Sequence, residues 1–459
     1  MSENIEIEAG KESGVKRGAR IPAFALALMG LAASWAPAAA EPARVLAFLH
    51  DGRFAAARDE LRRAGPATRP AELFLDAFTT YWLLVFDDEN DELRATLEGQ
   101  LQATLAATEK SRDPEASGEA ALWGGSSHLL LAELRASQRR PLAAAFEARK
   151  AKRLLESTAI AGVDATDARF GLGTYNYVAD TVPNYVKGLR ALLFLPRGNR
   201  ALGLKQLEEA ANGSRSFALE ARTLLVTIYA NKHERLYARA IEERDRLLAA
   251  FPDTIASAYA SARLDLSLGR NDTSLAQLAR AEDRARALGD VDPVVLRCID
   301  LLRARAELSA FRPDRAEATT KRALASGQGL SPAIRRDLEG LRDVSSRLAD
   351  GIDWPHEPAD FGALATKQPD RPLLSLLAGE AGLKAGRAQD ALEWFERAAA
   401  TGLPPEWQAA CLFRQGQAED LLGRRPRALE LYKRVSTTPG FVAKDGALYY
   451  QQSPFGTAR

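Results

Sequence analysis

The sequence predicts an all-α protein, and three observations support this fold class. The chain has 459 residues, of which 46% are hydrophobic and 27% charged, the usual balance of a globular chain with a large core. Beyond residue 41 it is rich in Ala, Leu, Arg and Glu and almost free of alternating β-branched stretches. It also repeats itself: GRAQDALEWFERA from Gly386 aligns without gaps with GRRPRALELYKRV from Gly423.

The repeat has a frame of four positions. A glycine is followed by a small residue five positions later, a large apolar residue nine positions later and a small residue twelve positions later. The last three positions share one helical face, which predicts close approach of a neighbouring helix, and the glycine predicts the preceding turn. A weaker copy has Phe311 in the glycine position. The other copies are Gly52, Ala57, Leu61 and Ala64; Gly198, Gly203, Leu207 and Ala210; Gly269, Ser274, Leu278 and Ala281; Gly386, Ala391, Phe395 and Ala398; and Gly423, Ala428, Tyr432 and Val435.

This frame, with a period in the mid-thirties, resembles the tetratricopeptide repeat (TPR), a helix-turn-helix unit. The resemblance covers most of residues 41 to 440. It implies a TPR-like helix-turn-helix solenoid, an α/α superhelix of roughly eight to ten helical pairs with a concave face that binds other proteins.

The first 40 residues are typical of a secretory signal peptide. A polar lead with four basic residues precedes the uncharged run IPAFALALMGLAASWAPAAA, which ends in the small residues Ala38 and Ala40. We expect cleavage before Glu41 and a periplasmic or secreted chain. An uncleaved anchor in the inner membrane is the alternative, because the polar lead is long.

The rest of the chain divides into four predicted parts. Residues 41–349 form the N-terminal helical-repeat array, with an insert at about 181–197. The proline-rich stretch 350–372 is a linker, since prolines at this density prevent a continuous helix. Residues 373–440 form a C-terminal pair of repeats, and 441–459 form a tail or an extended cap.

The sequence offers few parts for catalysis. The four histidines lack a partner at the spacing of a helical metal site, and no nucleophile elbow, phosphate loop or paired-cysteine motif occurs. We therefore expect a protein that is not an enzyme and binds no metal or cofactor. Cys298 and Cys411 lie in apolar helical contexts that favour buried thiols, although a single disulfide stays open. The formal net charge of +1 argues against nucleic acid as a partner.

The segment around Gly171 and Gly173 has a Gly-x-Gly pattern but not the third glycine or the preceding strand of a dinucleotide site. We interpret both glycines as close-packing positions in a repeat helix. The insert that follows predicts a short basic amphipathic helix at 185–195 that packs in its own groove, contacts a partner helix or lies on a membrane surface. Its candidate contact residues are Tyr185, Lys187, Leu189, Arg190, Leu192 and Leu193.

Residues 170–210 also resemble the eukaryotic tetratricopeptide repeat protein 39 family. The matching elements are Gly171 with Gly173, Val182 with Pro183, the apolar run 189–195, Gly198 with Arg200, and Gly203 with Leu204. That family is regarded as non-enzymatic and linked to organelle membranes and protein or lipid handling, so the resemblance implies an adaptor. The secretory signal departs from the family pattern and puts its partners and compartment in doubt here.

The last candidate is a basic cluster formed by Arg135, Arg139, Arg140, Arg149, Lys150, Lys152 and Arg153. Solvated helix faces are one interpretation, and recognition of an acidic peptide is the other.

Taken together, the sequence predicts an exported scaffold or adaptor that binds a protein or peptide in the bacterial cell envelope. Lipid contact through the insert helix is the alternative, and an enzyme is the third possibility.

Overall fold

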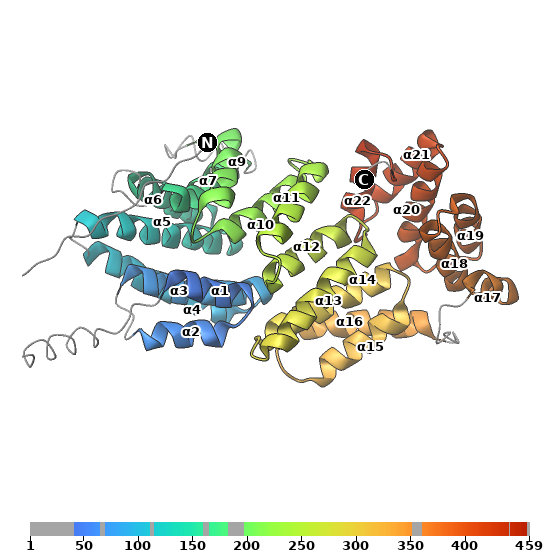
Figure 1. Ribbon diagram of the computed structural model, residues 1–459, viewed down its shortest axis with the longest axis horizontal. Coiled ribbons are helices and arrows are strands. Elements are labelled where there is room, and N and C mark those ends of the chain that lie inside the picture. The colour runs from blue at the N-terminus through green and yellow to red at the C-terminus, as the bar shows by residue number, and fades with distance from the viewer. Residues whose placement is uncertain are drawn as a thin grey trace, which may run out of the picture. The chain divides into compact units, whose positions relative to one another are not determined.

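The computed structural model describes residues 41–64, 69–110, 114–158, 165–181, 197–350, 360–439 and 441–456. These residues form 21 helices and no strand, which confirms the all-α prediction (Figure 1). The described residues all belong to one compact unit. The predicted signal peptide, 1–40, lies outside the described residues.

The first eleven helices extend from Pro42 to Ser267. They are α1 (Pro42–His50), α2 (Phe54–Arg63), α3 (Pro70–Phe86), α4 (Asp91–Lys110), α5 (Pro114–Ser137), α6 (Pro141–Thr158), α7 (Ala165–Thr181), α9 (Arg200–Gly213), α10 (Ala218–Ala230), α11 (Tyr237–Ala250) and α12 (Ile255–Ser267).

The remaining helices complete the compact unit. They are α13 (Asn271–Leu288), α14 (Pro293–Ser309), α15 (Pro313–Ala325), α16 (Pro332–Ala349), α17 (Phe361–Lys367), α18 (Pro372–Lys384), α19 (Ala388–Ala400), α20 (Pro405–Leu421), α21 (Arg425–Ser436) and α22 (Lys444–Gln452).

Local sequence explains where many of these helices begin. Proline stands in the first or second position of α1, α3, α14, α15, α16, α18, α20 and α21. A proline there loses no hydrogen bond, because the first amides of a helix have no partner within it. The side chains of Asn199, Thr254 and Ser331 cap α9, α12 and α16 by accepting a hydrogen bond from an amide three residues later.

Six helix-helix turns have the same backbone geometry. In the turn between α18 and α19, Gly386 has a φ of 73°. Its amide donates to the carbonyl of Leu383 (3.1 Å), and the amide of Arg387 donates to the carbonyl of Gly382 (2.9 Å). The same two bonds recur at Gly52, Arg139, Gly269, Phe311 and Gly423, all with positive φ. This arrangement satisfies the last carbonyls of the preceding helix and reverses the chain.

Consecutive helices form most of the helix-helix contacts, for example α5 with α6, α7 with α9, and α12 with α13. In the two C-terminal hairpins, a glycine of the first helix accommodates an aromatic ring of the second. A Cβ atom added to Gly379 would lie 2.5 Å from Cε1 of Phe395, and one added to Gly416 would lie 2.6 Å from Cε1 of Tyr432. Both rings are fully buried in these close contacts.

The N-terminal hairpin also contacts helices that lie about 200 residues later in the chain. Asp51 accepts hydrogen bonds from the amide of Ile255 at the start of α12 (3.2 Å) and from Arg284 of α13 (2.6 Å). The amide of Asp292 donates to the carbonyl of Gly52 (2.8 Å). In a simple array each repeat contacts only its neighbours, so the repeat frame does not predict these contacts.

The C-terminal helices likewise share a hydrophobic cluster with α10, α11 and α12. Tyr229 and Tyr237 belong to the same cluster as Phe413, Tyr432 and Tyr450. Figure 1 shows α22 beside α12. Residues 373–440, expected as a separate pair of repeats, are therefore part of the compact unit that also holds the N-terminal array.

Two predicted segments without repeats contain helices. Helix α17 lies inside the expected linker 350–372, while residues 351–359 lie outside the described residues. Helix α22 lies inside the expected tail 441–459, where Tyr449 and Tyr450 are buried. These two aromatic side chains belong to the hydrophobic cluster that also holds residues of α12, α20 and α21, although they do not follow the repeat frame.

Candidate binding surface

Most of the predicted repeat residues lie inside the protein, whereas the turn residues Gly386 and Gly423 are exposed. Gly52, Gly269, Gly386 and Gly423 have positive φ and end a helix. Ala64 is partly buried. The other predicted positions of the stripe are buried: Ala57, Leu61, Gly203, Leu207, Ala210, Leu278, Ala281, Ala391, Phe395, Ala398, Ala428 and Tyr432. These residues build the core and are not available to a partner.

Gly198 has a different role from the expected turn glycine. Its φ is not in the left-handed region, and a Cβ atom there would lie 2.5 Å from the carbonyl oxygen of Asn176 in α7. Gly198 still precedes α9, whose residues Gly203, Leu207 and Ala210 are buried at the positions of the repeat frame. Its small size lets the chain before α9 touch the backbone of α7.

Gly171 and Gly173 are contact points between helices. A Cβ atom added to Gly171 would lie 2.6 Å from Cδ1 of Leu155 in α6, and one added to Gly173 would lie 2.8 Å from Cγ of Leu207 in α9. Both glycines are buried within α7. The Gly-x-Gly pattern thus lies in a helix that packs on its neighbours. Tyr185, Lys187, Leu189, Arg190, Leu192 and Leu193, the candidate contacts of the insert, lie outside the described residues.

The histidines and cysteines are dispersed. His50 contacts Glu220 (3.0 Å), and Nδ1 of His128 contacts Glu147 (2.5 Å). Both cysteines are free and buried: Cys298 donates to the carbonyl of Phe86 and Cys411 to that of Phe395. In the described ranges, no group of three or more His, Cys, Asp or Glu side chains could hold a metal ion. None of the described helices is long and apolar enough to cross a bilayer.

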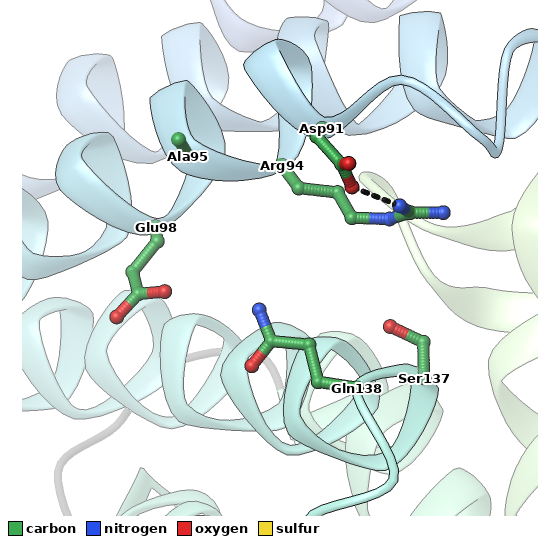
Figure 2. Close-up of a pocket in the computed structure, with 6 residues that line it drawn as sticks. All are labelled: Asp91, Arg94, Ala95, Glu98, Ser137 and Gln138. Carbon is green, nitrogen blue, oxygen red and sulfur yellow. Dashed lines mark hydrogen bonds and ion pairs between the residues drawn. The ribbon is translucent and has the colours of Figure 1, made fainter.

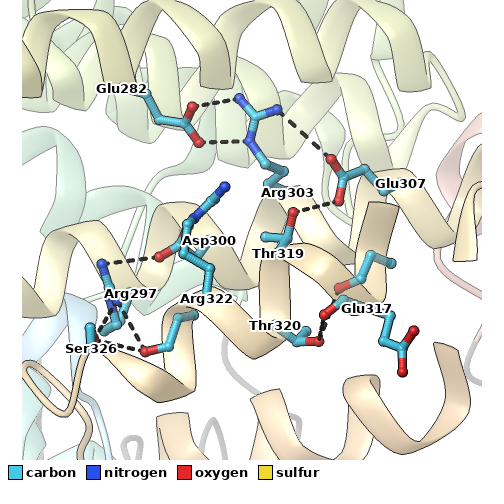
Figure 3. A network of polar contacts seen from close by, with 12 residues as sticks. Glu282, Arg297, Asp300, Arg303, Glu307, Glu317, Thr319, Thr320, Arg322 and Ser326 are labelled. Atoms are coloured by element: carbon cyan, nitrogen blue, oxygen red, sulfur yellow. Dashed lines mark hydrogen bonds and ion pairs between the residues drawn. The ribbon is translucent and has the colours of Figure 1, made fainter. Parts of the chain in front are cut away.

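A polar network joins α13, α14 and α15 (Figure 3). Arg303 donates two hydrogen bonds to Glu282 (2.6 and 2.8 Å) and lies 3.8 Å from Glu307, to which Thr319 donates (2.9 Å). Burial raises the pKa of the Glu307 carboxyl, while the hydrogen bond from Thr319 and the charge of Arg303 lower it in part.

The second half of the same network is centred on Asp300. Arg322 donates to Asp300 (2.9 Å), and Arg297 lies 3.1 Å from it and also donates to Ser326 (2.6 Å). These charges pair with each other across three helices. The network therefore stabilises the contact between α13, α14 and α15 rather than offering free groups to a ligand.

An open depression of about 440 Å³ lies between α4 and α5. Figure 2 shows side chains from the two helices facing each other across it. Arg94 pairs with Asp91 (2.6 Å), and Glu98 pairs with Arg135, whose hydrogen bond lowers the pKa of the Glu98 carboxyl. The depression is lined by Asp91, Arg94, Ala95, Glu98, Ser137 and Gln138.

The turn that follows Gln138 leads to the most unusual exposed surface. On α6, Ala151 and Leu155 face the core, whereas Leu142 and Phe146 are each 45% exposed. With 100° between successive helical residues, Leu142 and Phe146 lie opposite the buried pair. We call the α6 surface the exposed set Arg139, Arg140, Leu142, Phe146, Arg149, Lys150 and Arg153.

The cations of the α6 surface are mostly unpaired. Lys150 has an ion pair with Glu147 (3.3 Å), a residue that also contacts His128. Arg139, Arg140, Arg149 and Arg153 have no ion-pair partner in the part of the chain that the structure describes. By contrast, Arg135 and Lys152 of the predicted basic cluster pair with Glu98 and Glu156. The structure thus separates a paired part of that cluster from an unpaired part.

Sequence reasoning named the cations but not Leu142 and Phe146. The available signal was a partial copy of the repeat frame, since Ala144 and Ala151 stand five and twelve positions after Arg139, although Ala148 at the ninth position is small. Arg139 occupies the glycine position with a φ of 57°, and a search that starts from glycine does not find this copy.

Comparisons with known proteins add no family to these observations. No protein-family model matches the chain, and a search of curated proteins found no match.

Proposed function

We propose that this chain is an exported helical-repeat scaffold, of the TPR-like solenoid type, that binds another protein or peptide in the cell envelope. The observation that carries the proposal is the α6 surface, where two large apolar side chains stand exposed among arginines that have no ion-pair partner within the described residues. An exposed apolar group bordered by charges is typical of a contact surface. Export rests on the sequence of residues 1–40 alone.

The helical hairpins support the scaffold part of the proposal. Six turns with the same two hydrogen bonds, five of them followed by largely buried stripes in the same frame, are the geometry expected of stacked helix-turn-helix units. Proteins of this architecture generally act by presenting helix faces to partners. The function still has to come from a surface, because an architecture hosts many functions.

Crosslinking in cells followed by affinity capture tests this function. The full chain with a C-terminal tag should return the same partner protein in independent captures, and a tagged unrelated exported protein should not. A chain that reproducibly captures no protein, at native expression and after crosslinking, would sink the scaffold proposal.

Lipid contact through residues 185–195 is the second candidate. Val178 at the end of α7 and Leu202 at the start of α9 are both exposed and lie on the helices that flank this segment. The test is co-sedimentation with vesicles that contain phosphatidylglycerol. If the chain does not sediment, or sediments equally well with Leu189→Asp and Leu193→Asp, the lipid candidate is wrong.

A further inference from the structure

The order of residues along the α6 surface is regular. Arg139 and Arg140 stand before the helix, Leu142 and Phe146 follow on its first turns, and Arg149, Lys150 and Arg153 continue the same exposed face. A helix rises 1.5 Å per residue, so the surface from Arg139 to Arg153 extends over about 21 Å. It is a narrow stripe with an apolar centre and cations at both ends.

The charge of this stripe is unbalanced. Residues 139–158 contain six Arg or Lys and two Glu, an excess of four positive charges. The two glutamates, Glu147 and Glu156, already contact Lys150 and Lys152. Elsewhere on the described surface, exposed cations commonly have a carboxylate neighbour, as Arg286 has Asp283 and Arg336 has Glu89. The lack of a counter-charge among the residues that the structure describes favours an acidic partner.

We propose that the α6 surface binds an acidic amphipathic helix, which lies along α6 with its apolar side chains on Leu142 and Phe146 and its carboxylates at both ends. A helix of about 14 residues covers the stripe. This proposal rests on the proposed scaffold function and names its partner by chemistry. Arginine suits this contact because its planar group makes paired hydrogen bonds with a carboxylate.

The shape of the stripe favours a helix over a lipid surface. Helices that lie in a membrane interface have a broad apolar face along much of their length. Here only two large apolar side chains are exposed, one turn apart, and the cations stand on the same line rather than beside it. A partner helix matches this line residue by residue, in the manner of other helix-on-helix recognition.

The neighbouring depression fits the same partner. Ser137 and Gln138 line it and directly precede Arg139 and Arg140. Its charged side chains, Arg94 and Glu98, are already paired. The depression therefore extends the surface with polar groups that can accept or donate hydrogen bonds at the end of a bound helix, while the arginines supply the charge.

A designed peptide tests the proposal directly. The probe is a fluorescein-labelled 15-residue helix with two central leucines four positions apart and glutamates at both ends of the same face. Two control peptides replace the glutamates with glutamine or the leucines with alanine. Binding to the full chain, expressed with a C-terminal tag and purified as the cell processes it, is measured by fluorescence anisotropy at 50 mM and 300 mM salt.

Two variants of the protein remove the two halves of the contact. Leu142→Ser with Phe146→Ser removes the apolar centre, and Arg149→Glu with Arg153→Glu reverses the charge. Leu202→Ser is the apolar control, because Leu202 is 42% exposed on α9. Arg62→Glu with Arg63→Glu on the exposed end of α2 is the charge control. Far-UV circular dichroism establishes that each variant is folded.

The expected result is a loss of peptide affinity of at least tenfold in both α6 variants and with both control peptides. Binding should be weaker at 300 mM salt than at 50 mM. The two control variants should change the affinity by at most twofold. Equal binding of the glutamine peptide, or equal binding by either α6 variant, would overturn the proposal. A third outcome would also overturn it: the original chain binds vesicles of phosphatidylglycerol and phosphatidylcholine but not the peptide, and only the α6 variants lose vesicle binding. The surface would then bind lipid.

The same variants separate this inference from the scaffold function. If the partner captured from cells stays bound to both α6 variants, the scaffold function holds and the α6 surface is not its site. If neither the original chain nor any variant captures a partner, the scaffold function itself fails.

Discussion

Replacing Gly269 with alanine tests how the C-terminal helices dock on the turn between α12 and α13. Gly269 has a φ of 73°, a conformation that costs an alanine roughly 1–2 kcal/mol. Its new Cβ would also lie 2.5 Å from Cε1 and 2.8 Å from Cζ of the buried Phe413. An extra methyl group in a filled core costs about 1–3 kcal/mol. The two effects together predict a loss of roughly 2–5 kcal/mol of unfolding free energy.

Gly386→Ala is the matched control. Gly386 has the same φ of 73°, but a Cβ atom there has no neighbour within 4 Å. It should lose only the conformational part, about 1–2 kcal/mol. The assay is urea unfolding followed by far-UV circular dichroism and by tryptophan fluorescence, with Trp407 of α20 close to the docked helices.

A double-mutant cycle isolates the contact with Phe413. The effect of Gly269→Ala should be smaller when Phe413 is replaced by leucine, because the leucine side chain does not extend to the position of Cζ. Equal losses in Gly269→Ala and Gly386→Ala, with no coupling to Phe413, would refute the reasoning that α20 packs on this turn.

Three further predictions follow from the structure. Gly379→Ala should destabilise the protein by about 1–3 kcal/mol in urea unfolding, because its Cβ would meet the ring of Phe395 at 2.5 Å. Burial lowers the pKa of the His128 imidazole, so the folded state resists protonation. The free energy of unfolding should therefore fall as the pH drops below about 6.5. A pH series of urea midpoints should show a smaller fall in His128→Gln. Burial raises the pKa of Cys298 and of Cys411 to about 12, so a thiol reagent at pH 8 should modify neither in the folded chain and two after denaturation.

Each of these predictions has its own control. Gly340 lies in α16 with nothing within 4 Å of an added Cβ, so Gly340→Ala should raise stability by up to about 1 kcal/mol. A stability loss in Gly340→Ala as large as that in Gly379→Ala would contradict the close-contact argument. An unchanged pH dependence in His128→Gln would contradict the role of His128. Rapid modification of a thiol in the folded chain, or a disulfide in the purified protein, would contradict the burial of both cysteines.

The sequence predicted the helical fold and much of the interior, because the repeat frame depends on local geometry. The spacing of Ala391, Phe395 and Ala398 places them on one helical face whatever the rest of the chain does. The turns at Gly386 and Gly423 were accessible for the same reason, since glycine adopts positive φ without strain.

Two turns have no glycine: the one at Phe311 was found only through the other positions of the frame, and the one at Arg139 was not found. Arg139 and Phe311 adopt φ values of 57° and 59°, which residues with a Cβ atom rarely do. Phe311 is fully buried and its ring contacts that of Trp407 (5.8 Å between centroids). Tertiary contacts therefore accompany the unfavourable backbone conformation at that turn, and no local pattern predicts such contacts.

Contacts between distant helices were also beyond the repeat frame. The hydrogen bonds of Asp51 with α12 and α13 join segments more than 200 residues apart, and a repeat pattern carries information only about near neighbours. The helix at 444–452 was missed because its buried Tyr449 and Tyr450 do not follow the frame. At the candidate surface, the cations were visible in the sequence, but their pairing depended on which helices meet, as Arg135 with Glu98 shows.

Photo-crosslinking at position 146 tests the central claim most directly. A photoreactive phenylalanine analogue placed at Phe146 of the full chain in living cells should crosslink to a partner protein, and mass spectrometry should locate the crosslink in an acidic helical segment of that partner. The same analogue at Leu202, an exposed site on α9, should give no such product. Absence of a crosslink at position 146, or the same products from both positions, would contradict the assignment of the α6 surface as the binding site.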